Sequence, residues 1–162
     1  MGPTACNQAE RGVVRAVTVL SVDPIARDHE ALGQILNCSQ RSLCPDSQWT
    51  LTATPTVALA LSAIREMPVP ILICSCDDRS DSWKELLEAF PSLAHPPLLI
   101  VTSRMADERL WAEALNLGAY DVLAKPFDRH EVTRIVSMAW LHWKERTEAP
   151  QSYYVATAGR VS

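Results

Sequence analysis

The chain has 162 residues, of which 48% are hydrophobic and 21% charged, and its formal net charge is −4. This length is sufficient for one globular domain with a full core and short tails. The slight acidic excess argues against nucleic acid as the main partner, because binding to phosphates needs clustered lysine and arginine.

The sequence shows no segment that would direct the chain into a membrane or out of the cell. No apolar run approaches the roughly 18–20 residues that span a bilayer, and the first residues, MGPTACNQAERG, lack the apolar core of a signal peptide. The five cysteines are an odd number and are most simply explained as reduced thiols. We therefore expect a cytoplasmic protein without membrane contact.

The first half of the chain predicts two strands, each followed by a helix. Residues 16–22, AVTVLSV, are typical of a buried strand, and residues 24–37 predict a helix with Asp23 as its N-cap. After a loop over residues 39–48, residues 49–54 alternate like a strand and residues 56–67 predict a helix capped by Thr54 or Thr56. The stripe that indicates the first helix consists of Ile25, His29, Leu32, Ile35 and Leu36.

The second half repeats this pattern three more times. The predicted strands are residues 69–75, 96–103 and 121–124, and the predicted helices are residues 81–90, residues 107–118 and a last helix that begins after its N-cap Asp128. Ser80 or Asp81 is expected to cap the third helix, and Gly118 ends the fourth. One face of the last helix is apolar: Val132, Ile135, Val136, Ala139 and Trp140. We expect residues 1–14 to be a flexible arm, residues 15–143 the domain and residues 144–162 a C-terminal tail.

Five successive strand–helix units indicate an α/β fold with a parallel sheet covered by helices on both faces. Ligands of such sheets collect at the carboxyl ends of the strands. Three polar residues leave strands there: Asp23 after the first, Thr102 in the fourth and Lys125 after the fifth. With a nucleophilic carboxylate after the third strand, such a set would suit phosphoryl transfer to aspartate, because a metal and a lysine neutralise phosphate oxygens and a hydroxyl contacts the phosphoryl group.

Two stretches of sequence carry a resemblance to a known family. The more specific is LLIVTSRMADERLWAEALNLGAYDVLAKPFDRHEV, with a hydroxyl after a buried strand, Gly-Ala-x-Asp after a helix, and then Lys-Pro-Phe. The other is VTVLSVDPIARDHEAL near the beginning of the chain. With them the chain resembles the receiver domain of two-component response regulators over most of its length, residues 15–143.

The resemblance implies a fold and several residue roles. The fold would be flavodoxin-like, a doubly wound five-stranded parallel sheet in the order 2-1-3-4-5. Lys125 would match the family's lysine and Thr102 its switch hydroxyl, while Val122 stands at the family's aromatic switch position. The bond between Lys125 and Pro126 would be cis.

The chain departs from the family at the acidic positions. The position of the phosphoacceptor aspartate is Ser75, and the adjacent pair of magnesium-binding acids aligns with Ser21 and Val22, which leaves only Asp23 nearby. A bulge or a two-residue slip of the third strand would make Asp77 or Asp78 a displaced acceptor. In that case Asp23 and Asp77 would be the candidate metal ligands; otherwise the acids are loop residues, free to pair with Lys125.

From these departures we expect a receiver-like domain of bacterial type that is not phosphorylated in the usual way, is not an enzyme and needs no cofactor, Mg²⁺ included. Its partners would be a histidine kinase, a phosphotransfer protein or another signalling protein, with a homodimer through the fourth and fifth helices as one option. The alternatives are a phosphorylatable receiver that uses Asp77 or Asp78 with Mg²⁺, a constitutive interaction module, and a small hydrolase or redox protein that uses Ser75 or the Cys74/Cys76 pair.

Several other residues are conspicuous but have simpler explanations. The Cys-x-Cys pair fits core packing better than a metal or redox site, because the sequence shows no second cluster of ligands. Trp140 and Trp143 form a stripe that belongs either to the core or to an interface. The scattered histidines are expected to be ordinary surface or helix residues: His29, His95, His130 and His142.

Overall fold

The computed structural model describes residues 14–43, 46–79 and 81–149. The predicted arm, apart from Val14, and the part of the predicted tail from residue 150 onward therefore lie outside the described residues. The described part forms a five-stranded sheet, entirely parallel, in the order β2-β1-β3-β4-β5. The expected α/β fold and strand order are thus confirmed. The strands are β1 (Arg15–Val22), β2 (Ser47–Thr54), β3 (Ile71–Ser75), β4 (Leu98–Ser103) and β5 (Asp121–Ala124).

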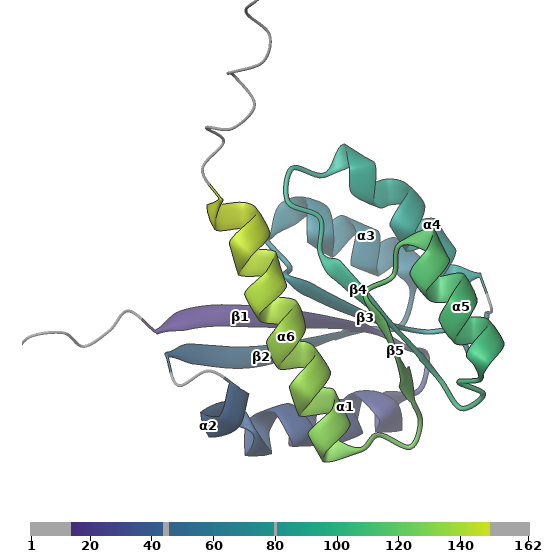
Figure 1. The fold of residues 1–162 in the computed structure, drawn as a ribbon, viewed down its shortest axis with the longest axis horizontal. Coiled ribbons are helices and arrows are strands. Elements are labelled where there is room, and N and C mark those ends of the chain that lie inside the picture. Colours follow the sequence, from purple (N-terminus) through teal and green to yellow (C-terminus); the bar gives the residue numbers. More distant parts are fainter. Residues whose placement is uncertain (1–13, 44–45, 80, 150–162) are drawn as a thin grey trace, which may run out of the picture.

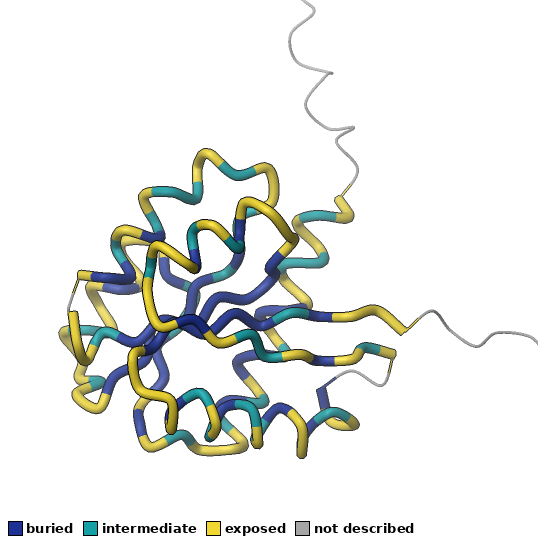
Figure 2. The backbone as a smooth tube through the Cα atoms, turned by 180° about the vertical axis from the view of Figure 1, so that it is seen from behind, coloured by how far each residue is buried: buried dark blue, intermediate teal, exposed yellow. Residues whose placement is uncertain are grey.

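Helices cover both faces of the sheet (Figure 1). They are α1 (Ala26–Cys38), α2 (Gln40–Leu43), α3 (Val57–Glu66), α4 (Ser82–Ala89), the 3₁₀ turn η1 (Phe90–Ser92), α5 (Glu108–Leu117) and α6 (Arg129–Glu148). Side chains of α1, α2 and α6 share one core cluster with one face of the strands, and those of α3, α4 and α5 share a second cluster with the other face. The central strands are therefore buried on both sides, as the dark tube in Figure 2 shows.

The ends of the helices match the sequence in part. Thr56, Asp107 and Asp128 accept hydrogen bonds from backbone N–H groups of the first turns of α3, α5 and α6, and Gly118 ends α5 with a φ of 107°. The expected cap of α1 is wrong, and that of α4 is confirmed in its position but makes no side-chain capping hydrogen bond. Asp23 lies outside α1, and Asp81 occupies the N-cap position of α4 but pairs with Lys84 at 2.9 Å instead; Ser80, the other cap candidate, lies outside the described residues.

Two elements differ from their predicted extents. Residues 40–43, expected to be loop, form the short helix α2, whose Leu43 packs into the core. Helix α6 continues to Glu148, beyond the expected domain end at residue 143, and Arg15 pairs with Glu148 at 2.6 Å. The end of the helix is thereby linked to the start of β1.

The tryptophan stripe of α6 faces the protein interior. Trp140 is 5% exposed, Trp143 packs against the same cluster, and their rings stack with centroids 5.8 Å apart. Trp49 of β2 meets Trp140 edge-on. Of the two explanations that the sequence left open for this stripe, core or interface, the structure therefore supports the core.

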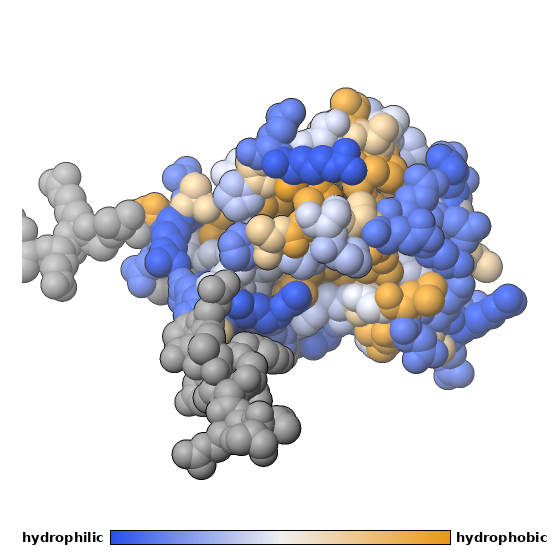
Figure 3. Space-filling model, turned by 90° about the horizontal axis from the view of Figure 1, so that it is seen from above, coloured by the Kyte–Doolittle hydropathy of each residue, from blue (hydrophilic) through white to orange (hydrophobic). Residues whose placement is uncertain are grey.

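None of the helices within the described residues is long and apolar enough to cross a membrane. On the face that Figure 3 shows, hydrophobic side chains form groups among hydrophilic ones.

Candidate functional site

The carboxyl ends of three strands bring together three of the predicted site residues. Asp23 directly follows β1, Ser75 is the last residue of β3, and Lys125 directly follows β5. All three are buried, and the Lys125 side chain is only 1% exposed. The bond from Lys125 to Pro126 is cis, the isomer that the resemblance implies.

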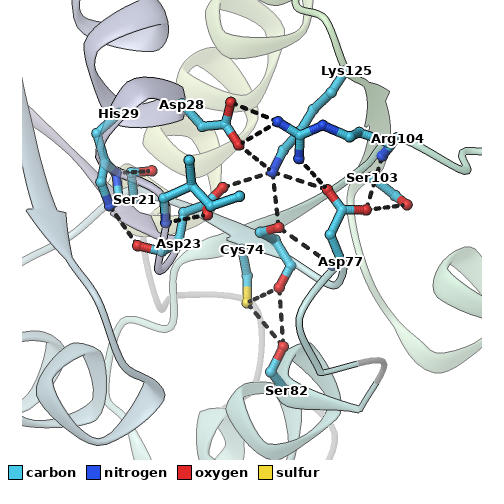
Figure 4. A network of polar contacts seen from close by, with 12 residues as sticks. Ser21, Asp23, Asp28, His29, Cys74, Asp77, Ser82, Ser103, Arg104 and Lys125 are labelled. Carbon is cyan, nitrogen blue, oxygen red and sulfur yellow. Dashed lines mark hydrogen bonds and ion pairs between the residues drawn. The ribbon is translucent and has the colours of Figure 1, made fainter.

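The ammonium group of Lys125 is the centre of a polar network (Figure 4). It donates to Asp23 Oδ2 at 2.7 Å and to Ser75 Oγ at 2.9 Å. The carboxylates of Asp28 and Asp77 also lie against it, at 2.9 and 3.1 Å. An ammonium group has three N–H donors, so these four acceptors compete for it. Lys125 therefore pairs with Asp23 and Asp77, as expected, and with one acid that the sequence did not single out.

That acid, Asp28, lies in the first turn of α1, and its side chain is 12% exposed. Its second partner is Arg104, which directly follows β4 and donates from one guanidinium nitrogen to both carboxylate oxygens, at 3.1 and 3.2 Å. The predicted stripe of α1 is confirmed at Leu32 and Leu36, and Ile35 packs partly buried against the same core, but Ile25 is exposed and His29 only partly buried. The buried residue that the prediction missed is Asp28. The helical spacing of Asp28 from two leucines was the signal that could have identified it.

The end of β1 is held by local hydrogen bonds. Asp23 Oδ1 accepts from the backbone N–H of Ile25, which leaves Oδ2 for Lys125. The ring of His29 bridges Ser21 Oγ, at 2.9 Å, and the carbonyl oxygen of Asp23, at 2.7 Å. His29 is therefore part of the support for Asp23 rather than an ordinary helix residue.

Asp77 extends from the loop after β3 to the loop after β4. Its Oδ1 accepts from Ser103 Oγ at 2.8 Å and from the backbone N–H of Arg104 at 2.9 Å. Its Oδ2 accepts from the Arg104 guanidinium at 3.1 Å, beside Lys125. The hydroxyl in contact with the site is thus that of Ser103. The prediction of Thr102 for this role is wrong by one position, because successive side chains of a strand point to opposite faces.

Ser75 occupies the end of β3 without any slip of the strand. β3 pairs residue by residue with β4, ending at Ser75 opposite Thr102, and Asp77 lies two residues beyond this ladder. The bulge that would bring Asp77 into the strand is therefore not formed. Asp78 is exposed and lines a cavity of about 130 Å³ together with Ser75.

The network sets the charge state of its members. Burial of Lys125 favours its neutral form, but hydrogen bonds to Asp23 and Asp28 outweigh this and raise the pKa of Lys125 above 10.5. Burial likewise raises the pKa of Asp28 and of Asp77, but contacts with Lys125 and Arg104 lower both below 3.8. At neutral pH Lys125 is therefore a cation. Although it lies 2.9 Å from Ser75 Oγ, it does not act as the base that a nucleophilic serine needs.

The two cysteines of the Cys-x-Cys pair have the character of core residues. Cys74 is fully buried, and burial raises the pKa of its thiol to about 12. Burial also raises the pKa of the partly buried Cys76. Both thiols are protonated at neutral pH, which disfavours a thiolate nucleophile or a metal thiolate.

The resemblance to receiver domains implies a magnesium site, but the residues of this chain do not fit one. Mg²⁺ needs carboxylate and carbonyl oxygens around an open position. Here the ammonium of Lys125 lies between Asp23, Asp28 and Asp77, and Arg104 bonds two of these acids as well. Within the described residues no group of three or more His, Cys, Asp or Glu side chains is arranged to hold a metal ion.

Comparisons with solved structures identify the fold. The signal receiver domain of an HD domain-containing protein from Pseudomonas fluorescens matches with a TM-score of 0.70 and 23% identity, over 87% of this chain and 98% of that domain. The chain has the fold of response-regulator receiver domains. A response regulator from Thermotoga maritima matches with a TM-score of 0.66 and 16% identity, over 78% of this chain and 98% of that one.

A response regulator receiver protein from Pseudoalteromonas atlantica gives a TM-score of 0.60 at 21% identity, over 77% of this chain and 98% of that one. No protein-family model and no curated protein sequence matches the chain. The relation to receiver domains therefore rests on the fold and on the motifs around Lys125.

We expect the free energy of unfolding to fall as the pH is lowered below about 4, because Asp28 and Asp77 have pKa values below 3.8 in the folded state. Their contribution is complete above the unfolded pKa and is lost as the pH falls through the folded values. Urea unfolding between about pH 2 and pH 7 measures this dependence. Asp77→Asn should make the free energy of unfolding less dependent on pH in this range. An unchanged dependence would show that the ionised Asp77 does not stabilise the folded state.

Proposed function

We propose that the chain is a receiver-type module of two-component signal transduction that works without phosphorylation and without Mg²⁺. It has no catalytic role in this proposal and acts by binding other proteins. Its partner would be a histidine kinase, a phosphotransfer protein or another signalling protein. The receiver fold and the Lys125-Pro126-Phe127 motif support the signalling part of this proposal.

The observation that carries the proposal is the occupancy of the Lys125 ammonium. In phosphoryl transfer to an aspartate, a lysine at this position must be available to neutralise phosphate oxygens. Here three carboxylates already contact Lys125, and the residue at the end of β3 is a serine. A serine hydroxyl is a poor substitute for a carboxylate as acceptor from a phosphohistidine.

The partner-binding surface is proposed to include α5. Three apolar side chains of this helix are exposed, namely Trp111, Leu115 and Leu117, and Trp111 and Leu115 line a shallow hollow of about 550 Å³. Exposed aromatic and aliphatic side chains of this kind contribute strongly to protein interfaces. A homodimer through α5 and α6, the fourth and fifth helices of the predicted repeat, would use the same region.

Incubation with acetyl phosphate and Mg²⁺ tests the proposal. We expect no phosphoryl adduct by intact-mass spectrometry and no change in partner binding, with a phosphorylatable receiver as the positive control. A single adduct that is lost in Asp77→Ala or Asp78→Ala would establish the displaced-acceptor alternative instead. An adduct lost only in Ser75→Ala would show that the serine accepts phosphate.

A further inference from the structure

The carboxylate of Asp77 is surrounded by donors from segments outside its own loop. Ser103 Oγ and the backbone N–H of Arg104 donate to one oxygen, and the Arg104 guanidinium and the Lys125 ammonium lie against the other. The side chain is 18% exposed. One hydroxyl, one backbone N–H and two cations around a single anionic group form the donor set of an oxyanion site.

The cations of this site are held in place by other residues. Lys125 also bonds Asp23 and Asp28, and Arg104 also bonds Asp28 through its other nitrogen. Removal of the Asp77 side chain would therefore leave both cations near their positions. The formal charge of the cluster would change from −1, for three aspartates against two cations, to zero.

The same contacts fix the segment between β4 and α5. Ser103 donates to Asp77 and accepts from the backbone N–H of Met105 at 3.0 Å, and Arg104 is bonded through its backbone and its side chain. The chain then enters α5, whose N-cap is Asp107. The position of the first turn of α5 therefore depends on the anion between Ser103 and Lys125.

We propose that Ser103, Arg104 and Lys125 form an oxyanion site whose permanent occupant is the chain's own Asp77 carboxylate. Because Asp77 is part of the chain, the effective concentration of its carboxylate at the site is higher than the concentration of a free anion in solution. It holds residues 103–105 and the start of α5 in one position without covalent modification. The inference rests on the proposed function only in taking α5 as a partner-binding surface.

Amide hydrogen exchange of wild type and Asp77→Ala tests this site. Without the carboxylate, the amide of Arg104 should exchange about tenfold faster or more, because its hydrogen bond to a charged acceptor is lost. The amide of Met105 should also exchange faster, because its acceptor, the Ser103 hydroxyl, loses the carboxylate that holds it in place. Inorganic phosphate should restore their protection in the variant in a saturable manner. Chloride at equal ionic strength should not, because screening alone does not fill the site. Wild-type exchange should not respond to phosphate.

Asp78→Ala is the matched control, because Asp78 is an exposed neighbouring acid. In this variant the amides of Arg104 and Met105 should exchange at the wild-type rate. Equal exchange at Arg104 in wild type and Asp77→Ala would overturn the proposal, as would a loss of protection that phosphate does not reverse. If Asp77→Ala does not fold, Asp77→Asn replaces it: it keeps an acceptor for the Arg104 N–H but loses the charge. The Arg104 amide of Asp77→Asn should then exchange faster than that of wild type, and exchange at the wild-type rate would overturn the proposal.

These measurements need no partner and no phosphodonor. An adduct with acetyl phosphate would refute the proposed function and leave the exchange result intact. Failure of the exchange test would leave open a phosphorylation-independent role that does not depend on a fixed α5.

Discussion

Replacement of Lys125 by methionine is expected to lower the free energy of unfolding by about 3–5 kcal/mol at neutral pH, because removal of one partner leaves buried charges uncompensated. Three carboxylates lose the ammonium group that contacts them, and the side chains of Asp23 and Asp28 are only 5% and 12% exposed. Arg104 contacts Asp28 and Asp77 but not Asp23. Urea unfolding of wild type and variant measures the difference.

Lys84→Met is the matched control. Lys84 is paired with Asp81 and Glu113 on the surface, and exposed ion pairs contribute little to stability because water screens them. The Lys125→Met defect should also shrink on acidification towards about pH 4, because protonation relieves the unpaired carboxylates. Asp23→Asn in the same chain should restore part of the stability. A loss no larger than that of Lys84→Met would show that the network does not contribute to folding.

The fold could be predicted because its signals are local. The apolar runs of β1, β3 and β4 and the cap residues Thr56 and Asp128 follow from a few neighbouring residues each. The order of strands came from the family resemblance. The carboxyl-end rule for parallel sheets then identified Asp23 and Lys125 from their place directly after a strand.

The rest of the site could not be predicted because it depends on side-chain direction and on contacts between distant segments. Thr102 and Ser103 both end β4, and only the direction of each side chain decides which one meets Asp77. Asp28 and Arg104 lie 76 positions apart in sequence and meet through the fold. An acid in the first turn of a helix is usually explained by the helix dipole, which needs no burial, so this position alone does not predict the contact of Asp28 with Lys125.

Replacement of Trp83 by alanine is expected to destabilise the protein by about 3–5 kcal/mol, the usual cost of truncating a fully buried tryptophan. Trp83, in α4, is 0% exposed and belongs to the core cluster that α3, α4 and α5 share with one face of the sheet. Trp83→Phe should cost much less, because the ring remains and because the buried indole N–H of Trp83 has no hydrogen-bond partner in the described part of the chain. Trp111→Ala is the surface control, because Trp111 is 39% exposed.

The effect of Trp83→Ala should extend to the site. Ser82, the neighbour of Trp83 at the start of α4, has its hydroxyl 3.0 Å from the carbonyl oxygen of Ser75 and 2.9 Å from that of Arg79. Burial of Trp83 fixes the start of α4, and from there Ser82 contacts both ends of the loop that carries Asp77. We expect Trp83→Ala to accelerate amide exchange at Asp77 and Arg104 as well as in α4, whereas Trp111→Ala should leave these amides unchanged. Acceleration confined to α4 would mean that the Lys125 network holds the loop by itself, and that the core beneath it contributes only to global stability.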